Sequence, residues 1–216
     1  APADGPWGKA DTSVTGAPTL TTVAGYMVGT IANDTEVENL CLSFVDKLAF
    51  DIDDLIRAEF WLKCSATYAA TEQLAFGLCS ARNDDIDTLT AHASFRLIGA
   101  AAALGAITCE SDDGTTDKDD KDTGQTLAAT LKRFVIDFAR GLLAVSPGPS
   151  LGGKANVLFS MDDVRGNLVP VCRDTIFDMS GYTAGLQPYV QIQKTSAAGT
   201  PSFSLRRVRI TEKLGA

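Results

Sequence analysis

The stretch that decides the fold runs from Lys132 to Met179 and contains KRFVIDFARG (132–141) and ANVLFSMDDVRGNLVPVCRDTIFDM (155–179). Period-two alternation of apolar with other side chains is typical of β-strands that bury one face. Large apolar residues occupy alternate positions in both segments: Phe134, Ile136 and Phe138 in the first, and Val157, Phe159 and Met161 in the second. The sequence therefore predicts antiparallel strands here, at the centre of a β-sandwich.

The same pattern recurs along the chain. Residues 162–167 (DDVRGN) have the composition of a hairpin turn between two of these strands. Apolar residues occupy every second position from residue 56 to residue 64, and Trp61 falls on the opposite, polar side. We count about eleven predicted strands, no long amphipathic helix and no second-domain linker. The prediction is an all-β protein, with one antiparallel sandwich domain over residues 20–216.

Residues 1–19 are rich in Pro, Gly, Ala and Thr and show no periodicity. They are predicted to form an extended N-terminal arm, because such a segment cannot bury enough apolar surface alone. Two interpretations stay open: a disordered tail, or an arm that orders against a neighbouring subunit with Trp7 as its anchor. Large aromatic residues are favoured as anchors of this kind.

Three other segments carry specific expectations. Residues 21–31 are predicted to form the first strand, and residues 37–48 fit either a helix or a strand, of which we favour the strand. In the last strand Phe203 and Leu205 share one face while Val208 and Ile210 share the other. This change of parity predicts a β-bulge.

The composition and net charge of the chain argue against several functions. The chain has 216 residues, 45% hydrophobic, and a net charge of −8, so nucleic-acid binding is not expected. No apolar run approaches the roughly 20 residues of a membrane-spanning helix, and the first residues do not resemble a signal peptide. The five cysteines lie in apolar runs and are expected to be free, as in a reducing cytoplasm.

Residues 111–124 contain six aspartates and no hydrophobic residue, which predicts an exposed loop. Asp117, Asp119 and Asp122 raise the possibility of calcium in the stretch from Asp112 to Asp122. The EF-hand spacing fails, however, because Lys121 stands where a third ligand belongs. We therefore expect a solvated loop and no cofactor.

Catalytic signatures are sparse. The single histidine, His92, falls on the polar face of a predicted strand and is expected to be an ordinary surface residue. The chain has no nucleophile elbow and no recognisable pair of glycosidase carboxylates, so we expect no enzyme. Trp61, Tyr182 and Tyr189 are candidates for an exposed aromatic platform that binds a partner or a sugar.

Four motifs together resemble a known family. They are FVIDF (134–138), VLFSMD (157–162), GNL (166–168) and PYVQIQK (188–194). This pattern is similar to that of concanavalin A-like jelly-roll domains found in tailed-phage virions. The resemblance covers most of the chain after residue 40, implies a jelly-roll fold, and carries no catalytic residues.

The resemblance, the acidic composition and the Gly/Pro-rich arm suggest a capsid decoration (cement) protein on the outer surface of a phage head. Its expected partners are the major capsid protein and copies of itself, with a trimer favoured by symmetry. Such a protein would be synthesised in the host cytoplasm and would stabilise the assembled shell. The alternative is a carbohydrate-binding, lectin-like module, and a glycoside hydrolase is a third and weaker possibility.

Overall fold

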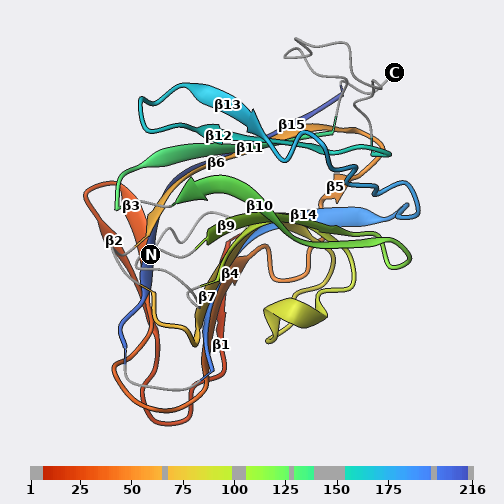
Figure 1. Ribbon diagram of the computed structural model, residues 1–216. Coiled ribbons are helices and arrows are strands. Elements are labelled where there is room, and N and C mark those ends of the chain that lie inside the picture. Colours follow the sequence, from red (N-terminus) through yellow and green to blue (C-terminus); the bar gives the residue numbers. More distant parts are fainter. Residues whose placement is uncertain are drawn as a thin grey trace.

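Two antiparallel sheets pack face to face in the computed structural model, which describes residues 7–64, 68–98, 106–126, 129–138, 154–195 and 199–213 (Figure 1). The eight-stranded sheet has the order β1-β4-β14-β7-β8-β9-β10, with β5 pairing β14 outside this path. The seven-stranded sheet has the order β13-β12-β11-β6-β15-β3-β2. In the described part of the chain, no helix is long and apolar enough to cross a membrane.

The bounds of the elements are as follows. The eight-stranded sheet contains β1 (Gly8–Asp11), β4 (Glu38–Ser43), β5 (Phe50–Asp51), β7 (Glu72–Cys79), β8 (His92–Ile98), β9 (Ala106–Asp112), β10 (Asp117–Thr126) and β14 (Gly185–Lys194). The seven-stranded sheet contains β2 (Thr19–Val23), β3 (Tyr26–Thr30), β6 (Leu55–Cys64), β11 (Lys132–Asp137), β12 (Leu158–Asp162), β13 (Leu168–Val171) and β15 (Ser202–Glu212). A single turn of 3₁₀ helix, η1 (Ile86–Thr88), precedes β8.

The stretch that suggested the fold forms β11, β12 and β13, as predicted. Phe134 lies opposite Met161 and Ile136 opposite Phe159, and all four side chains are buried in the core. The predicted hairpin turn follows β12. Its Asp163 carboxylate accepts hydrogen bonds from the backbone nitrogens downstream, which fixes the register of β13.

Aromatic side chains from both sheets fill the centre of the sandwich. Phe76 and Phe95 come from the eight-stranded sheet, and Phe134 and Phe159 come from the seven-stranded sheet. The ring centroids of Phe95 lie 5.0 Å from Phe134 and 5.2 Å from Phe159, in edge-on contacts. Such contacts add to the free energy gained from burying the rings.

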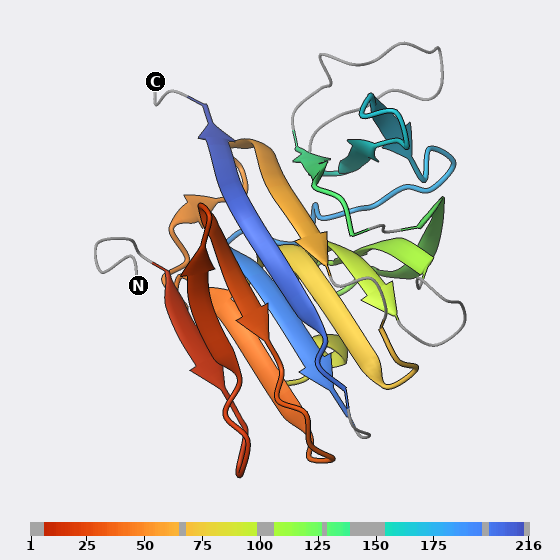
Figure 2. The same ribbon diagram turned by 90° about the vertical axis from the view of Figure 1, so that its left-hand side faces the viewer.

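The β-bulge predicted in the last strand is present. Leu205 pairs with Leu62, whereas the next paired residue is Arg207 opposite Trp61, so Arg206 is the inserted residue. The insertion turns Val208 back toward the core side of the sheet. The bulge lies just beyond Leu205, the last residue of β15 that pairs with β3; Figure 2 shows the dark blue β15 beside the gold β6.

Residues 21–31 do not form one strand. They belong to a hairpin in which Ala24 and Gly25 make the turn between β2 and β3, with φ values of 49° and 80°. Positive φ at both central residues defines the tight turn that matches the twist of paired strands. The expected strand at 37–48 is confirmed over Glu38–Ser43, which form β4, whereas Val45 and Asp46 turn the chain with positive φ values.

The acidic segment 111–124 is not a loop, which corrects the prediction. It contains the end of β9, a turn at Gly114 and most of β10, with Asp117 opposite Asp112. An edge strand pairs on one side only, so it tolerates charged residues that a central strand would not. The total of fifteen strands in the described residues exceeds the predicted eleven because of β1, β5, β10 and the split at Gly25.

Part of the predicted arm belongs to the sandwich. Gly8–Asp11 pairs with β4 at the edge of the eight-stranded sheet, and the Trp7 ring packs edge-on against Phe44 with centroids 4.9 Å apart. Residues 1–6 lie outside the described part of the chain. The role of the arm at a neighbouring subunit stays a prediction.

Candidate functional site

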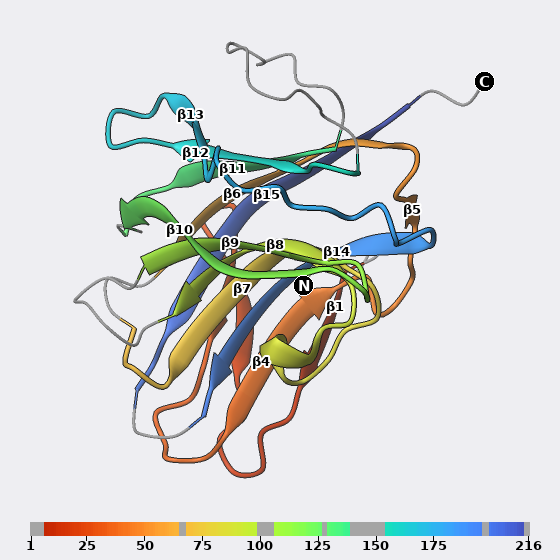
Figure 3. The ribbon, with the colours of Figure 1, turned by 45° about the vertical axis from the view of Figure 1, so that its right-hand side comes forward.

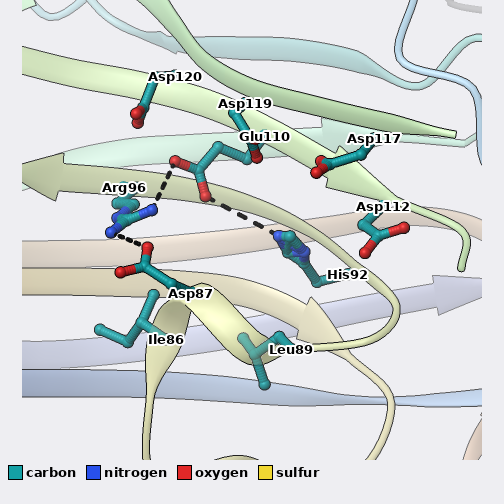
Figure 4. A pocket seen from close by; sticks show the side chains of 10 residues that line it. All are labelled: Ile86, Asp87, Leu89, His92, Arg96, Glu110, Asp112, Asp117, Asp119 and Asp120. Carbon is teal, nitrogen blue, oxygen red and sulfur yellow. Dashed lines mark hydrogen bonds and ion pairs between the residues drawn. The ribbon is translucent and has the colours of Figure 1, made fainter.

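A pocket of about 290 Å³ lies on the face of the eight-stranded sheet that points away from the core. Strands β8, β9 and β10 and the η1 segment surround it (Figure 4). Strand alternation positions its side chains, because Ala93, Phe95 and Leu97 of β8 point into the core and their neighbours point outward. The lining residues are Ile86, Asp87, Leu89, His92, Arg96, Glu110, Asp112, Asp117, Asp119 and Asp120.

The η1 segment covers this face of the sheet; Figure 3 shows it on the side away from the seven-stranded sheet. Ile86 and Leu89 pack against a small apolar cluster that includes Tyr189. Glutamines of β14 attach the segment to the sheet. Gln193 Oε1 accepts a hydrogen bond of 3.3 Å from the backbone nitrogen of Ile86, and Gln191 Nε2 donates one of 2.9 Å to the carbonyl of Asn83.

Arg96 links the η1 segment to the floor of the pocket. Its guanidinium donates to Gln73 and to Glu110 Oε1, the latter at 3.3 Å, and forms an ion pair with Asp87. The residue is only 7% exposed. Contacts with three different side chains hold the guanidinium in one orientation, so the pocket wall is fixed at this point.

Glu110 is buried in the floor of the pocket. Burial raises its pKa to about 8, with a further increase from the Asp120 carboxylate, whereas the charge of Arg96 opposes the rise. Glu110 is therefore largely protonated at neutral pH. It can donate a hydrogen bond as well as accept one.

His92 is also buried, which corrects the expectation of a surface histidine. It does lie on the polar face of its strand, but the η1 segment and β10 cover that face. Burial lowers the pKa of His92 to about 4, and its Nε2 lies 3.9 Å from Glu110 Oε2. The imidazole is neutral at pH 7, and its Nδ1 has no hydrogen-bond partner among the described residues.

Four aspartates of β9 and β10 complete the lining: Asp112, Asp117, Asp119 and Asp120. Burial and a hydrogen bond with the carboxylate of Asp119 raise the pKa of Asp117 to about 6. The same two kinds of effect, burial and neighbouring carboxylates, raise the pKa of Asp112. These shifts indicate that negative charge is concentrated on one side of the pocket.

The buried Glu110 predicts a specific dependence of stability on pH. Its folded pKa of about 8 exceeds the ordinary value of 4.5, so the folded state binds the proton more tightly and stability falls as pH rises through this range. His92 acts in the opposite sense, but only between its folded pKa of about 4 and its ordinary 6.5. Between pH 6.5 and 8 the free energy of unfolding should fall by roughly 1–2 kcal/mol.

Urea denaturation at pH 6.5 and pH 8 measures this change. The variant Glu110→Gln, which cannot ionise, should show nearly equal stability at the two values. A fall in the variant as steep as that in the original chain would show that another group is responsible.

The structure does not bring the predicted site residues together. Trp61 lies on the outer face of the seven-stranded sheet, with the Arg207 guanidinium 5.0 Å from its ring. Trp7 packs on Phe44, and the Tyr182 hydroxyl donates to the carbonyl of Gly185 at 3.1 Å. These residues belong to separate surfaces and do not form one aromatic platform.

The prediction that Tyr189 is an exposed aromatic residue is wrong. Its side chain is fully buried beneath Ile86 and Leu89, on the outer face of β14. The alternation of β14 places Tyr189 on the polar side of the strand, but it does not reveal that residues 80–91 return over that side. A sugar cannot reach the ring while this segment is in place.

Sequence reasoning missed the group formed by His92, Arg96 and Glu110. A signal existed, because alternation places His92 and Arg96 on one face of β8 and Glu110 on the corresponding face of β9. What the sequence did not show is that β8 and β9 are neighbours and that a third segment covers them.

A second acidic group, Asp34, Glu36 and Glu38, lies at the start of β4 and in the loop before it. Ligand atoms of these three residues lie within 4.8 Å of one another. Lys194 already forms ion pairs with two of these carboxylates. The Lys194 ammonium lies 2.9 Å from Glu38 Oε2 and 3.0 Å from Asp34 Oδ1, and it donates to the carbonyl of Ala32.

This second group has a structural role. Glu36 accepts hydrogen bonds from the backbone nitrogens of Val14, Thr15 and Gly16, and these bonds lower its pKa. Burial opposes protonation of Lys194, but its bonds to Glu38 and Asp34 outweigh this effect and raise its pKa. The network joins the start of β4 to the end of β14.

Comparison with known proteins identifies the fold. The structure matches the carbohydrate recognition domain of Emp46p in its potassium-bound form, with a TM-score of 0.55, 15% identity, and coverage of 95% of this chain and 88% of that one. It matches a legume lectin-like domain from Entamoeba histolytica with a TM-score of 0.55, 8% identity and coverage of 96% and 90%. It matches peanut lectin with a 9mer peptide, with a TM-score of 0.58, 8% identity and coverage of 97% and 99%.

No family model matches the sequence. No curated protein matches it. The chain has the concanavalin A-like, legume lectin-like β-sandwich fold, which confirms the predicted fold class. At these identities the likeness concerns the fold alone.

Proposed function

We propose that this chain is a carbohydrate-recognition domain that binds a saccharide in the pocket between β8, β9, β10 and the η1 segment. The observation that carries the proposal is the convergence of carboxylates and a neutral imidazole, held by paired strands, in one small cavity. Carboxylates accept hydrogen bonds from sugar hydroxyls, and an imidazole both donates and accepts. Ligand pockets span roughly 300–1,000 Å³, so this cavity suits a ligand of one or two sugar rings.

The pocket also offers an apolar contact. Ile86 and Leu89 line it on the side of η1, but they are only 3% and 4% exposed, so little more than their edges can contact a sugar ring. Solved structures that share the fold include a carbohydrate recognition domain and a lectin. The fold is compatible with many functions, so the proposal rests on the side chains of the pocket.

We further propose that binding is not followed by catalysis. Glu110 is the one carboxyl of the pocket with a pKa near 8, but it is 2% exposed and its Oε1 is held by Arg96. A general acid must reach the leaving oxygen of the substrate. We therefore assign Glu110 a structural role in the pocket.

A glycan array probed with the labelled protein tests the proposal, followed by calorimetric titration of the best ligand. The variant Asp119→Asn should weaken binding about 10-fold or more, because hydrogen bonds to a charged group contribute about 1.5–3 kcal/mol. Asp54→Asn, an exposed site in the turn before β6, is the matched control and should bind normally. Release of reducing ends from the bound glycan should not occur.

A blank array at high protein concentration would contradict the proposal, and cleavage of the glycan would contradict its non-catalytic part. Decoration of a phage head stays a prediction from the sequence resemblance, because none of the solved structures named above is a virion protein. Binding to purified capsids would test it directly.

A further inference from the structure

The charges of the pocket do not balance. The lining contains six carboxyl groups, from Asp87 on η1, from β9 and from β10, and a single guanidinium, that of Arg96. Arg96 is fully engaged by Asp87, Glu110 and Gln73. Four aspartates make no ion pair with any described lysine or arginine: Asp112, Asp117, Asp119 and Asp120.

Lys118 and Lys121 do not provide the missing charge. Both belong to β10, but neither lines the pocket or pairs with a carboxylate in the described part of the chain. The two other titratable groups that face the aspartates are uncharged at neutral pH, since Glu110 is protonated and His92 is deprotonated. Arg96 is therefore the only cation among the described residues of the lining, and its ion pairs are with Asp87 and Glu110.

The spacing of these carboxylates suits an organic cation better than a metal ion. In the described part of the chain, three ligand atoms within 4.8 Å of one another occur at Asp34, Glu36 and Glu38, and not in this pocket. A divalent ion needs several oxygens within about 2.6 Å of its centre. An ammonium group can instead be held by two acceptors, and the carboxylates of Asp117 and Asp119 lie close enough to interact by a hydrogen bond.

The buried, uncharged His92 side chain is a second indication that a ligand binds in this pocket. His92 is 6% exposed, forms part of the pocket wall, and has an Nδ1 with no hydrogen-bond partner in the described residues (Figure 4). A buried polar atom without a partner costs free energy. A ligand hydroxyl beside the imidazole would remove this cost, because a hydroxyl can donate to Nδ1 or accept from it.

We propose that the saccharide bound here is an amino sugar with a free ammonium group, as in a glucosamine unit, which Asp117 and Asp119 bind while a ring hydroxyl meets His92. This inference rests on the proposed function and specifies its ligand class. The neighbouring carboxylates Asp112 and Asp120 add long-range attraction. Because this attraction is electrostatic and partly exposed, rising salt should weaken it.

Calorimetric titration with a matched pair of trisaccharides tests the proposal at pH 7 and low salt. A trimer of β-1,4-linked glucosamine should bind at least 10-fold more tightly than its fully N-acetylated counterpart, which has the same ring framework but no ammonium. A diaminoalkane, which has ammonium groups but no ring, should bind more weakly than the amino trisaccharide.

Two variants localise the effect. Asp119→Asn should weaken binding of the amino trisaccharide about 10-fold and change binding of the acetylated form less than 2-fold. Asp54→Asn removes the same charge at a distant exposed site and should change neither. Both positions are exposed, so the variants should fold normally.

The outcomes separate the two proposals. Equal or tighter binding of the acetylated trimer would overturn the amino-sugar assignment and leave carbohydrate recognition in place. Equal binding of the diaminoalkane would overturn the role of the sugar ring. Absence of binding to every saccharide, here and on the array, would overturn the proposed function itself.

Discussion

Replacing Lys194 with methionine should destabilise the fold by about 3–5 kcal/mol, the loss expected when one partner of a buried ion pair is removed. The Lys194 ammonium and the Glu38 carboxylate are both 0% exposed and lie 2.9 Å apart. The methionine would leave Glu38 without its cation. It would also remove the donor to the carbonyls of Ala32 and Asp34.

Urea denaturation of the variant measures this loss, and the double variant Lys194→Met/Glu38→Gln is the matched control. An amide in place of the Glu38 carboxylate carries no charge that requires a partner, so the double variant should recover part of the lost stability. A loss below 1 kcal/mol in the single variant would show that the ion pair is not important for stability.

Replacing Phe95 with alanine should cost about 3–5 kcal/mol, the range for truncation of a buried phenylalanine. The Phe95 ring contacts rings from both sheets: Phe76 at 5.6 Å, Phe134 at 5.0 Å and Phe159 at 5.2 Å between centroids. Truncation opens a cavity that neighbouring strands cannot close, because backbone hydrogen bonds fix their positions.

Thermal and urea unfolding of Phe95→Ala measure this effect. Phe95→Leu retains much of the buried carbon and should lose clearly less stability than the alanine variant. If the two variants were equally stable, the cavity would not be the cause. A loss below 1 kcal/mol for Phe95→Ala would contradict the description of this ring as the centre of the core.

Alternation of side chains was sufficient to predict the fold class because each strand of a sandwich buries one face. Phe134, Ile136, Phe159 and Met161 lie in the core as the pattern indicated. The parity change before Val208 predicted the bulge at Arg206, since an inserted residue is what keeps both halves of β15 facing the core.

Local sequence patterns gave wrong predictions where turn geometry or strand pairing determined the structure. Residues 21–31 read as one strand because Ala24 gives no turn signal comparable to Asn or Asp before Gly25. The segment from Asp117 to Thr126 has no hydrophobic alternation, and it forms a strand because β9 offers an unpaired edge. Neither cause is visible in a window of ten residues.

The candidate site was hidden for a related reason. Alternation correctly places His92 on the polar face of its strand, but both His92 and Tyr189 are predicted to be exposed and are buried. Residues 80–91 cover that face, and this contact joins parts of the chain that lie about one hundred positions apart, as in the hydrogen bond from Gln191 to Asn83. The burial of Glu110 and His92, and hence their shifted pKa values, depends on this long-range contact.

The central claim is that a saccharide binds in the pocket formed by β8, β9, β10 and η1. The most direct test is amide NMR of the isotopically labelled chain during titration with the best ligand from the array. The largest shift changes should fall on residues 86–96, 108–112 and 117–120, and Asp119→Asn should require about 10-fold more ligand to reach the same changes. Changes confined to another surface, such as that around Trp61, or no changes at saturating ligand, would contradict the claim.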